Sequence, residues 1–263
     1  MSLFIETVGR DRTQPSIALL HGWGLNGAIW EGVRDALAAH FSLQIVDLPG
    51  HGFSRDVSLT TVDAVADSLS AALAGPCHVM GWSIGGQFAL ALARRHPALV
   101  QKLILVATTP KFVASDDWPD GSHGTKADVL NNFSESLSNN YAATIRGFLA
   151  LQALHQPDAR IAVSALQRAM SLRGEPIAAS LRAGLEILRR SDLRGDVPNI
   201  LHQTLVIQGD HDALTREGAA RWLAENMPNA QYALIPHAAH APFLSHREIF
   251  LNHVLNHLQS PTT

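Results

Sequence analysis

Short apolar runs recur along the chain, and each is bounded by Gly, Pro or Asp. The runs are too short for helices, and several are rich in β-branched residues, which is typical of buried strands. We therefore expect strands over residues 17–20, 43–46, 78–81, 102–107, 204–207 and 231–235.

Helical patterns lie between many of these runs. Ala- and Leu-rich or amphipathic stretches predict helices over residues 61–73, 85–95, 218–225 and 248–258, and Pro97 ends the second of them. Alternation of strands and helices predicts the α/β class, with a mostly parallel central sheet that helices cover on both faces.

The alternation breaks within residues 111–190, which contain no convincing strand. Amphipathic helices are predicted there over residues 127–137, 142–154, 159–171 and 177–189. We expect a helical cap, 111–190, inserted into a core made of residues 1–110 and 191–263. A cap between two strands would lie at their carboxyl ends, where α/β sheets bind ligands.

The amino-acid composition and net charge limit the classes of protein to which this chain can belong. Apolar residues make up 46% and charged residues 16%, which supports a large folded core. The net charge of −3 without a basic tail disfavours nucleic-acid binding. Cys77 is the lone cysteine, so an intrachain disulfide and a multi-cysteine metal site are excluded. The amino-terminal residues do not resemble a signal peptide, and no run of 18 apolar residues occurs. We expect a soluble, cytoplasmic, monomeric protein that does not bind membranes.

The sharpest chemical motif is Gly81-Trp82-Ser83-Ile84-Gly85, between a predicted strand and a predicted helix. That context is typical of the G-x-S-x-G nucleophile elbow, in which a strained turn exposes the serine hydroxyl. Glycines on both sides relieve steric clashes in the turn. Ser83 is therefore the candidate nucleophile.

A serine nucleophile needs a base and an acid that orients the base. His240 follows the last predicted strand and is the favoured base, with His237 and His246 as competitors. Asp210 and Asp212 both follow the strand at 204–207 and are the candidate acids. The order Ser, Asp, His is typical of α/β-hydrolases, but residue patterns alone do not separate the two aspartates.

An oxyanion hole is predicted from His21-Gly22-Trp23-Gly24, which follows the first predicted strand. The backbone N–H groups of Trp23 and of Ile84, the residue after the serine, are the expected donors. The sequence contains no phosphate-binding P-loop, Gly50-His51-Gly52 does not continue as G-x-G-x-x-G, and the late histidines lack zinc-protease H-E-x-x-H spacing. We therefore expect neither a metal nor a cofactor.

Taken together, these motifs resemble the α/β-hydrolase superfamily across nearly the whole chain. Further motifs resemble the pimeloyl-[acyl-carrier-protein] methyl ester esterases of biotin synthesis, which are carboxylesterases. They are HGWGLN at 21–26 with Trp30, GWS at 81–83, DWP at 117–119, FLALQ at 148–152, GLEIL at 184–188 and AAHAPF at 238–243.

The resemblance implies that the acid is Asp212, the last residue of Gly-x-x-Asp, and that Ser83 and His240 complete the triad. It implies that Trp23, Ser83, Ile84, His240 and the FLALQ residues Phe148, Leu149, Ala150, Leu151 and Gln152 bind substrate. It also implies an acyl carrier protein as partner, which the family meets with cap arginines. This chain has a partly similar set in Arg146, Arg160, Arg168 and Arg173.

Residues 140–190 carry seven arginines and three acidic residues, a net charge of 7 − 3 = +4. Two explanations of this charge stay open. The surface attracts an acidic carrier protein, or it is simply the solvent-exposed face of amphipathic helices. Three other functions stay open: a general short-chain carboxylesterase, a hydrolase that cleaves C–C bonds in diketones, and a non-catalytic ligand receptor on the same fold.

Overall fold

The computed structural model describes residues 2–9, 14–154 and 159–261. These residues contain a seven-stranded sheet with the strand order β1-β3-β2-β4-β5-β6-β7. The strands are β1 (Ile5–Val8), β2 (Ser16–Leu20), β3 (Ser42–Val46), β4 (Cys77–Trp82), β5 (Val100–Val106), β6 (Gln203–Gly209) and β7 (Ala230–Ile235). Strand β1 is antiparallel to β3, and the other neighbouring strands are parallel.

All six predicted strands are present, with ends that shift by a few residues. Strand β1 was not predicted, because its Ile-Glu-Thr-Val sequence at the sheet edge contains no buried apolar run. Strands β2, β3 and β4 are by contrast almost entirely buried, which is why their sequences are mostly apolar without strict alternation.

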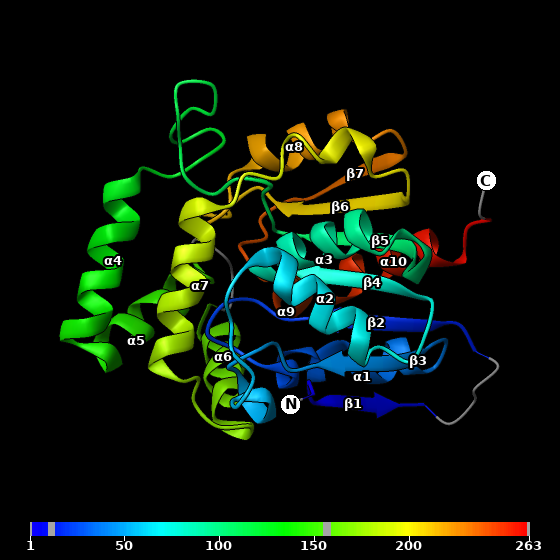
Figure 1. Cartoon of the computed structure of the whole chain (residues 1–263), viewed down its shortest axis with the longest axis horizontal. Helices are drawn as coiled ribbons and strands as arrows, with labels where there is room; N and C mark the ends of the chain where they lie inside the picture. Colours follow the sequence, from blue (N-terminus) through cyan, green and yellow to red (C-terminus); the bar gives the residue numbers. More distant parts are fainter. Residues whose placement is uncertain (1, 10–13, 155–158, 262–263) are drawn as a thin grey trace.

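Helices cover both faces of the sheet (Figure 1). Helices α2 and α3 pack together on one face, and α1 and α10 pack together on the other. The helices that alternate with the strands are α1 (Glu31–Ala38), α2 (Val62–Ala72), α3 (Ile84–Arg95), α8 (Glu217–Asn226), α9 (Pro242–Ser245) and α10 (Arg247–Gln259). Helices α1 and α9 were not predicted. Helix α1 has only eight residues and buries only Val33 and Leu37, which leaves a weak helical period.

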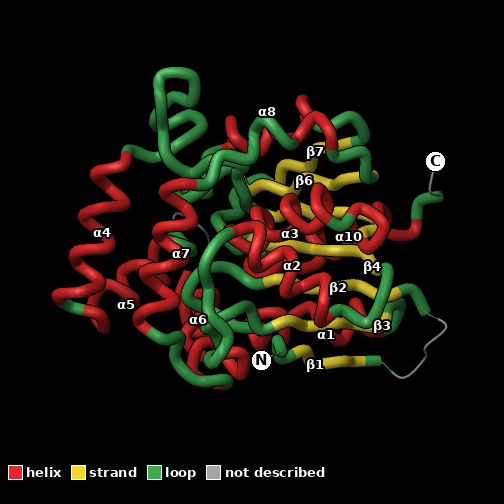
Figure 2. Tube along the Cα trace, viewed as in Figure 1, coloured by secondary structure: helices red, strands yellow, loops and turns green. Residues whose placement is uncertain are grey.

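Four further helices lie between β5 and β6, as predicted: α4 (Ala127–Asn139), α5 (Tyr141–Leu151), α6 (Ala159–Leu172) and α7 (Ala178–Arg190). They gather beyond the carboxyl ends of the parallel strands (Figures 1 and 2). The two connections to the sheet lie side by side, since Lys111 forms a β-bridge with Asp192 and the N–H of Leu193 donates to the carbonyl of Pro110 at 2.9 Å.

Polar contacts fix this helical layer to loops of the sheet layer. The indole N–H of Trp23 donates to the carbonyl of Leu181 at 2.9 Å, and Asn26 Nδ2 donates to the carbonyl of Ala169 at 2.9 Å. Both contacts begin in the loop after β2. The helices are therefore held directly above the loop that also contains Trp23, one of the two predicted oxyanion donors.

The position of Arg173 differs from the prediction that this residue meets the carrier protein. Its side chain is only 10% exposed, and it pairs with the buried carboxylate of Asp47 at 3.0 Å and with Glu6. Its guanidinium also lies over the rings of Phe4 and Phe53. Arg173 therefore ties the helical layer to the sheet, and it is not a surface residue that could meet a carrier protein.

Within the part of the chain that the structure describes, every helix is too short or too polar to cross a membrane.

Candidate active site

Ser83 lies at the turn between β4 and α3 with a left-handed backbone, φ 58° and ψ −126°. Side chains on the flanking glycines would not fit. A Cβ on Gly81 would lie 2.3 Å from the carbonyl oxygen of Gly85, and a Cβ on Gly85 would lie 2.5 Å from that of His21. The predicted elbow is thus formed, and its strain lifts the serine above the sheet.

Ser83, His240 and Asp212 form a continuous hydrogen-bonded chain. The Nε2 of His240 lies 3.0 Å from Ser83 Oγ, and its Nδ1 lies 2.8 Å from Asp212 Oδ2. Ser83 follows β4, His240 follows β7 and Asp212 follows β6. Because these strands are parallel, their carboxyl ends lie at the same edge of the sheet, which brings the three side chains together. This is the geometry in which a carboxylate orients an imidazole toward a serine hydroxyl.

The carboxylate of Asp212 is buried and fully engaged. Its Oδ1 accepts from the N–H groups of Leu214 at 2.8 Å and Thr215 at 3.0 Å. Its Oδ2 accepts from Thr215 Oγ1 at 2.6 Å and from Gln208 Nε2 at 3.1 Å, besides the contact with His240. Burial raises the pKa of Asp212, but His240 and the Thr215 donors outweigh burial and lower it below its ordinary value. Asp212 is therefore ionised at neutral pH.

The other sequence candidates for base and acid lie elsewhere. Asp210 is exposed, and its Oδ1 accepts from the backbone N–H of His237 at 2.5 Å. His246 bonds the hydroxyl of its neighbour Ser245 at 2.9 Å. Asp210 thus has a local role between two loops, and the structure brings neither His237 nor His246 to Ser83.

The loop after β2 packs against the elbow. A Cβ on Gly22 would lie 3.3 Å from Ser83 Cβ, so the backbone there runs beside the nucleophile. His21 anchors the loop: its Nδ1 lies 2.8 Å from the carbonyl of Gly22, and its Nε2 accepts from the N–H of Leu48 at 2.9 Å. Burial, together with neighbouring His51, lowers the pKa of His21 well below its usual value, so the ring is neutral. Ile84 is the first residue of α3, and the first N–H groups of a helix have no partner within it.

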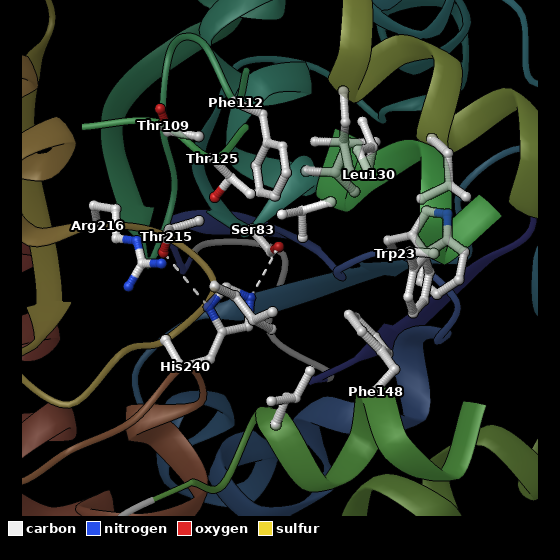
Figure 3. A pocket seen from close by; sticks show the side chains of 18 of the residues that line it. Trp23, Ser83, Thr109, Phe112, Thr125, Leu130, Phe148, Thr215, Arg216 and His240 are labelled. Atoms are coloured by element: carbon white, nitrogen blue, oxygen red, sulfur yellow. Dashed lines mark hydrogen bonds between the residues drawn. The ribbon is translucent and has the colours of Figure 1, made fainter. Parts of the chain in front are cut away.

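A cavity of about 500 Å³ opens over Ser83 and His240 between the sheet and the helices α4, α5 and α7 (Figure 3). Its walls are mostly apolar, with a few polar or charged groups. The lining residues are Trp23, Ser83, Ile84, Gln87, Thr109, Phe112, Asp120, Thr125, Lys126, Val129, Leu130, Phe133, Phe148, Leu151, Leu185, Leu188, Ala213, Leu214, Thr215, Arg216 and His240.

The structure corrects part of the predicted substrate segment. Phe148 and Leu151, one helical turn apart on α5, line the cavity. Leu149 is 2% exposed and packs in the core, and Ala150 is exposed to solvent. Gln152 is buried, but it is not a lining residue. The helical period of 3.6 residues explains this, because consecutive positions of one helix cannot all face one cavity.

The sequence did not predict several residues of the site. Thr215 and Gln208 bond Asp212, and Thr108 Oγ1 donates to the carbonyl of Ser83 at 2.6 Å. Thr215 stands three residues after Asp212, a spacing at which an aspartate bonds backbone N–H groups in a turn, so a local signal existed. Cavity residues on α4 and α7, such as Phe133 and Leu185, carry no such signal, since any amphipathic helix shows the same pattern.

Comparison with known proteins places this geometry in a family. The sequence model of the alpha/beta hydrolase fold matches residues 15–247. Solved structures agree on the fold: an esterase from Exiguobacterium antarcticum superposes with a TM-score of 0.86 at 23% identity, covering 98% of this chain and 96% of that chain. An enol-lactonase from Burkholderia xenovorans gives 0.82 at 20% identity, with 98% and 96% covered. The chain belongs to the α/β-hydrolase family, which confirms the predicted fold class.

Curated relatives narrow the membership further. The pimeloyl-[acyl-carrier protein] methyl ester esterase of Nitrosomonas europaea is 41% identical over 95% of this chain and 97% of its own length. That of Chromobacterium violaceum is 40% identical over 99% of both chains. Within the α/β-hydrolases, the family of these esterases therefore includes this chain, and the resemblance seen in its motifs is confirmed.

Proposed function

We propose that this chain is a serine carboxylesterase that hydrolyses the methyl ester of pimeloyl-[acyl-carrier protein]. The observation that carries the proposal is the hydrogen-bonded chain of Asp212, His240 and Ser83, open to an apolar cavity. Membership of the family of pimeloyl-[acyl-carrier protein] methyl ester esterases supports the choice of substrate.

In the first half of the reaction, Ser83 Oγ attacks the methyl ester carbonyl while His240 Nε2 accepts the hydroxyl proton. Negative charge that develops on the carbonyl oxygen is stabilised by the N–H groups of Trp23 and Ile84. Asp212 stabilises the imidazolium. When the tetrahedral intermediate collapses, the bond to the methoxy oxygen breaks, His240 returns its proton to that oxygen and methanol leaves.

In the second half, His240 takes a proton from water, whose oxygen attacks the acyl-serine carbonyl. Collapse of the second intermediate breaks the bond to Ser83 Oγ, and His240 protonates that oxygen. The products are methanol and a free carboxylate at the end of a chain still attached to its carrier. His240 carries the protons exchanged among Ser83, methanol and water, and the carboxylic acid product releases its own proton to solvent, so the proposed reaction requires no cofactor.

The shape of the site suits such a substrate. Trp23, Phe133, Phe148 and Leu185 offer apolar walls to a chain of methylene groups. In this proposal residues 111–190 act as a cap on the core, and the carrier protein stays outside it. Arg146, Arg160 and Arg168 are exposed on that cap and are proposed to meet the acidic carrier. A cytoplasmic monomer fits this role.

Rescue of growth without biotin tests the proposal, in a bacterial strain that lacks its own pimeloyl methyl ester esterase. The wild-type gene should restore growth and the Ser83→Ala gene should not. Failure of a well-expressed wild-type protein would refute the proposed substrate. Burst release of p-nitrophenol from a small ester, absent in Ser83→Ala, separates an esterase from a ligand receptor.

A further inference from the structure

A second group of ligating side chains lies outside the cavity, where the loops after β6 and β7 meet. Asp210 and His211 follow β6, and His237 follows β7. Each offers one ligand atom, and these atoms all lie within 4.8 Å of one another. Because β6 and β7 are adjacent parallel strands, this grouping follows from the topology and not from sequence spacing.

The backbone already ties these two loops together. The N–H of His237 donates to Asp210 Oδ1 at 2.5 Å, and the N–H of His211 donates to the carbonyl of Ala238 at 2.9 Å. The two imidazole rings stand edge to face, with centroids 5.4 Å apart. The side chains of His211 and Asp210 are 35% and 29% exposed, so an ion can reach them from solvent.

Two imidazoles and one carboxylate form a donor set that suits a borderline cation such as Zn²⁺. Zinc binds nitrogen and oxygen ligands at about 2.0–2.2 Å, which places tetrahedral ligand atoms roughly 3.4 Å apart. The observed separations need to shrink by about 1.4 Å at most. Side-chain rotations of partly exposed residues can supply such a change, and water can occupy the fourth position.

We propose that Asp210, His211 and His237 bind a zinc-like divalent cation that clamps the two loops to each other. His211 immediately precedes Asp212, and His237 lies three residues before His240. The ion would therefore stabilise the segments that hold the acid and the base, without touching either. The sequence predicts no metal, because the three ligands come from two segments and no motif within one segment contains them.

Titration of the full chain with ZnCl₂ by calorimetry, with thermal unfolding in parallel, tests the site. We expect saturable binding of one ion and a rise in Tm. His237→Asn and His211→Ala should each weaken binding by about tenfold or more, as loss of even an outer partner of a metal ligand does. Asparagine is chosen because His237 has φ 62°, a conformation that asparagine tolerates. His40→Ala, which removes an exposed histidine elsewhere, is the matched control and should bind as the wild type does.

Binding of Co²⁺ gives a spectroscopic signal that a change in folding alone cannot produce. Co²⁺ bound by imidazoles should develop a visible absorption band that His40→Ala retains and His237→Asn loses. Absence of saturable Zn²⁺ binding, or equal affinity in His237→Asn and His40→Ala, would overturn the proposal. Neither readout depends on ester hydrolysis, so the result is independent of the function proposed above.

Discussion

The indole N–H of Trp82 donates a 2.8 Å hydrogen bond to the backbone carbonyl of His240. Trp82 immediately precedes the nucleophile, and its ring also lies 5.5 Å from the imidazole, centroid to centroid. One buried side chain thus fixes the loop of the base relative to the elbow of the nucleophile. The 3.0 Å contact between His240 and Ser83 depends on that bond as well as on Asp212.

Trp82→Phe should test this anchoring. Loss of the donor leaves a buried carbonyl without its partner, which costs about 1–3 kcal/mol of unfolding free energy, and kcat should fall because the His240 loop is less well fixed. Trp118→Phe is the matched control, since Trp118 is equally buried and its indole donates to the carbonyl of Lys111 at 2.9 Å. Chemical denaturation should show a smaller destabilisation in Trp118→Phe, because the carbonyl of Lys111 keeps Thr109 Oγ1 as a donor, and esterase assays should show a reduced kcat only in Trp82→Phe. Equal kcat values would refute the positioning role.

Substitution of the two aspartates should separate their roles. Asp212→Asn should lower kcat by about 10⁴-fold, because a neutral amide favours the wrong tautomer of His240. Asp210→Asn should cost far less, since Asp210 accepts from the backbone N–H of His237 and pairs with His211, and neither residue is the base. Initial rates on a p-nitrophenyl ester measure both. A larger loss in Asp210→Asn would mean that the acid is misassigned.

Sequence reasoning recovered the elements whose signals are local. The elbow at Ser83 is encoded by neighbouring glycines, and each buried strand is a short run of mostly apolar residues. The choice of Asp212 over Asp210 needed the family resemblance, because both follow the same strand. In the structure burial separates them, since Asp212 lies inside under His240 while Asp210 faces solvent.

Features that depend on packing were not predictable from the sequence. Arg173 looked like the other cap arginines, yet the fold buries it against Asp47 and Glu6. Leu149 and Ala150 belong to a motif that resembles a substrate segment, but helix geometry turns them away from the cavity that Phe148 and Leu151 line. Which face of a helix lines a cavity depends on the elements that pack against that helix. The periodicity of its sequence does not identify those elements.

Lowering the pH should destabilise the folded chain at pH values well above those at which carboxylates titrate. Burial lowers the pKa values of His51, His78 and His257 to about 4, whereas an unfolded histidine titrates near 6.5. Between these values the unfolded state binds more protons, so stability falls as pH drops from about 6.5 toward 4. Each such histidine should cost about 2 kcal/mol between pH 7 and pH 5.

Urea unfolding at pH 7 and pH 5 measures this loss. His257→Gln should remove about 2 kcal/mol of the difference, whereas His40→Gln, at an exposed position, should leave the difference unchanged. A wild-type stability that is the same at both pH values would contradict the prediction.

Charge on the cap should matter only for a carrier-bound substrate. Complementary charges chiefly raise the encounter rate and are screened over about 8–10 Å at physiological salt. Added salt and Arg160→Glu or Arg168→Glu should therefore lower kcat/KM on the carrier-bound ester and barely change hydrolysis of a small neutral ester. Arg247→Glu, an exposed charge reversal on α10, is the control. Parallel responses of the two substrates would show that the cap does not recognise the carrier.

The most direct test of the central claim is hydrolysis of purified pimeloyl-[acyl-carrier protein] methyl ester, followed by mass spectrometry of the carrier. The wild type should convert the ester to the free acid and release methanol. Ser83→Ala, which removes one small hydroxyl from a folded turn, should remain folded and lose roughly 10⁴-fold or more in activity. A fluorophosphonate should label the wild type at Ser83. Ester hydrolysis that persists in Ser83→Ala, or labelling at a different residue, would contradict the account.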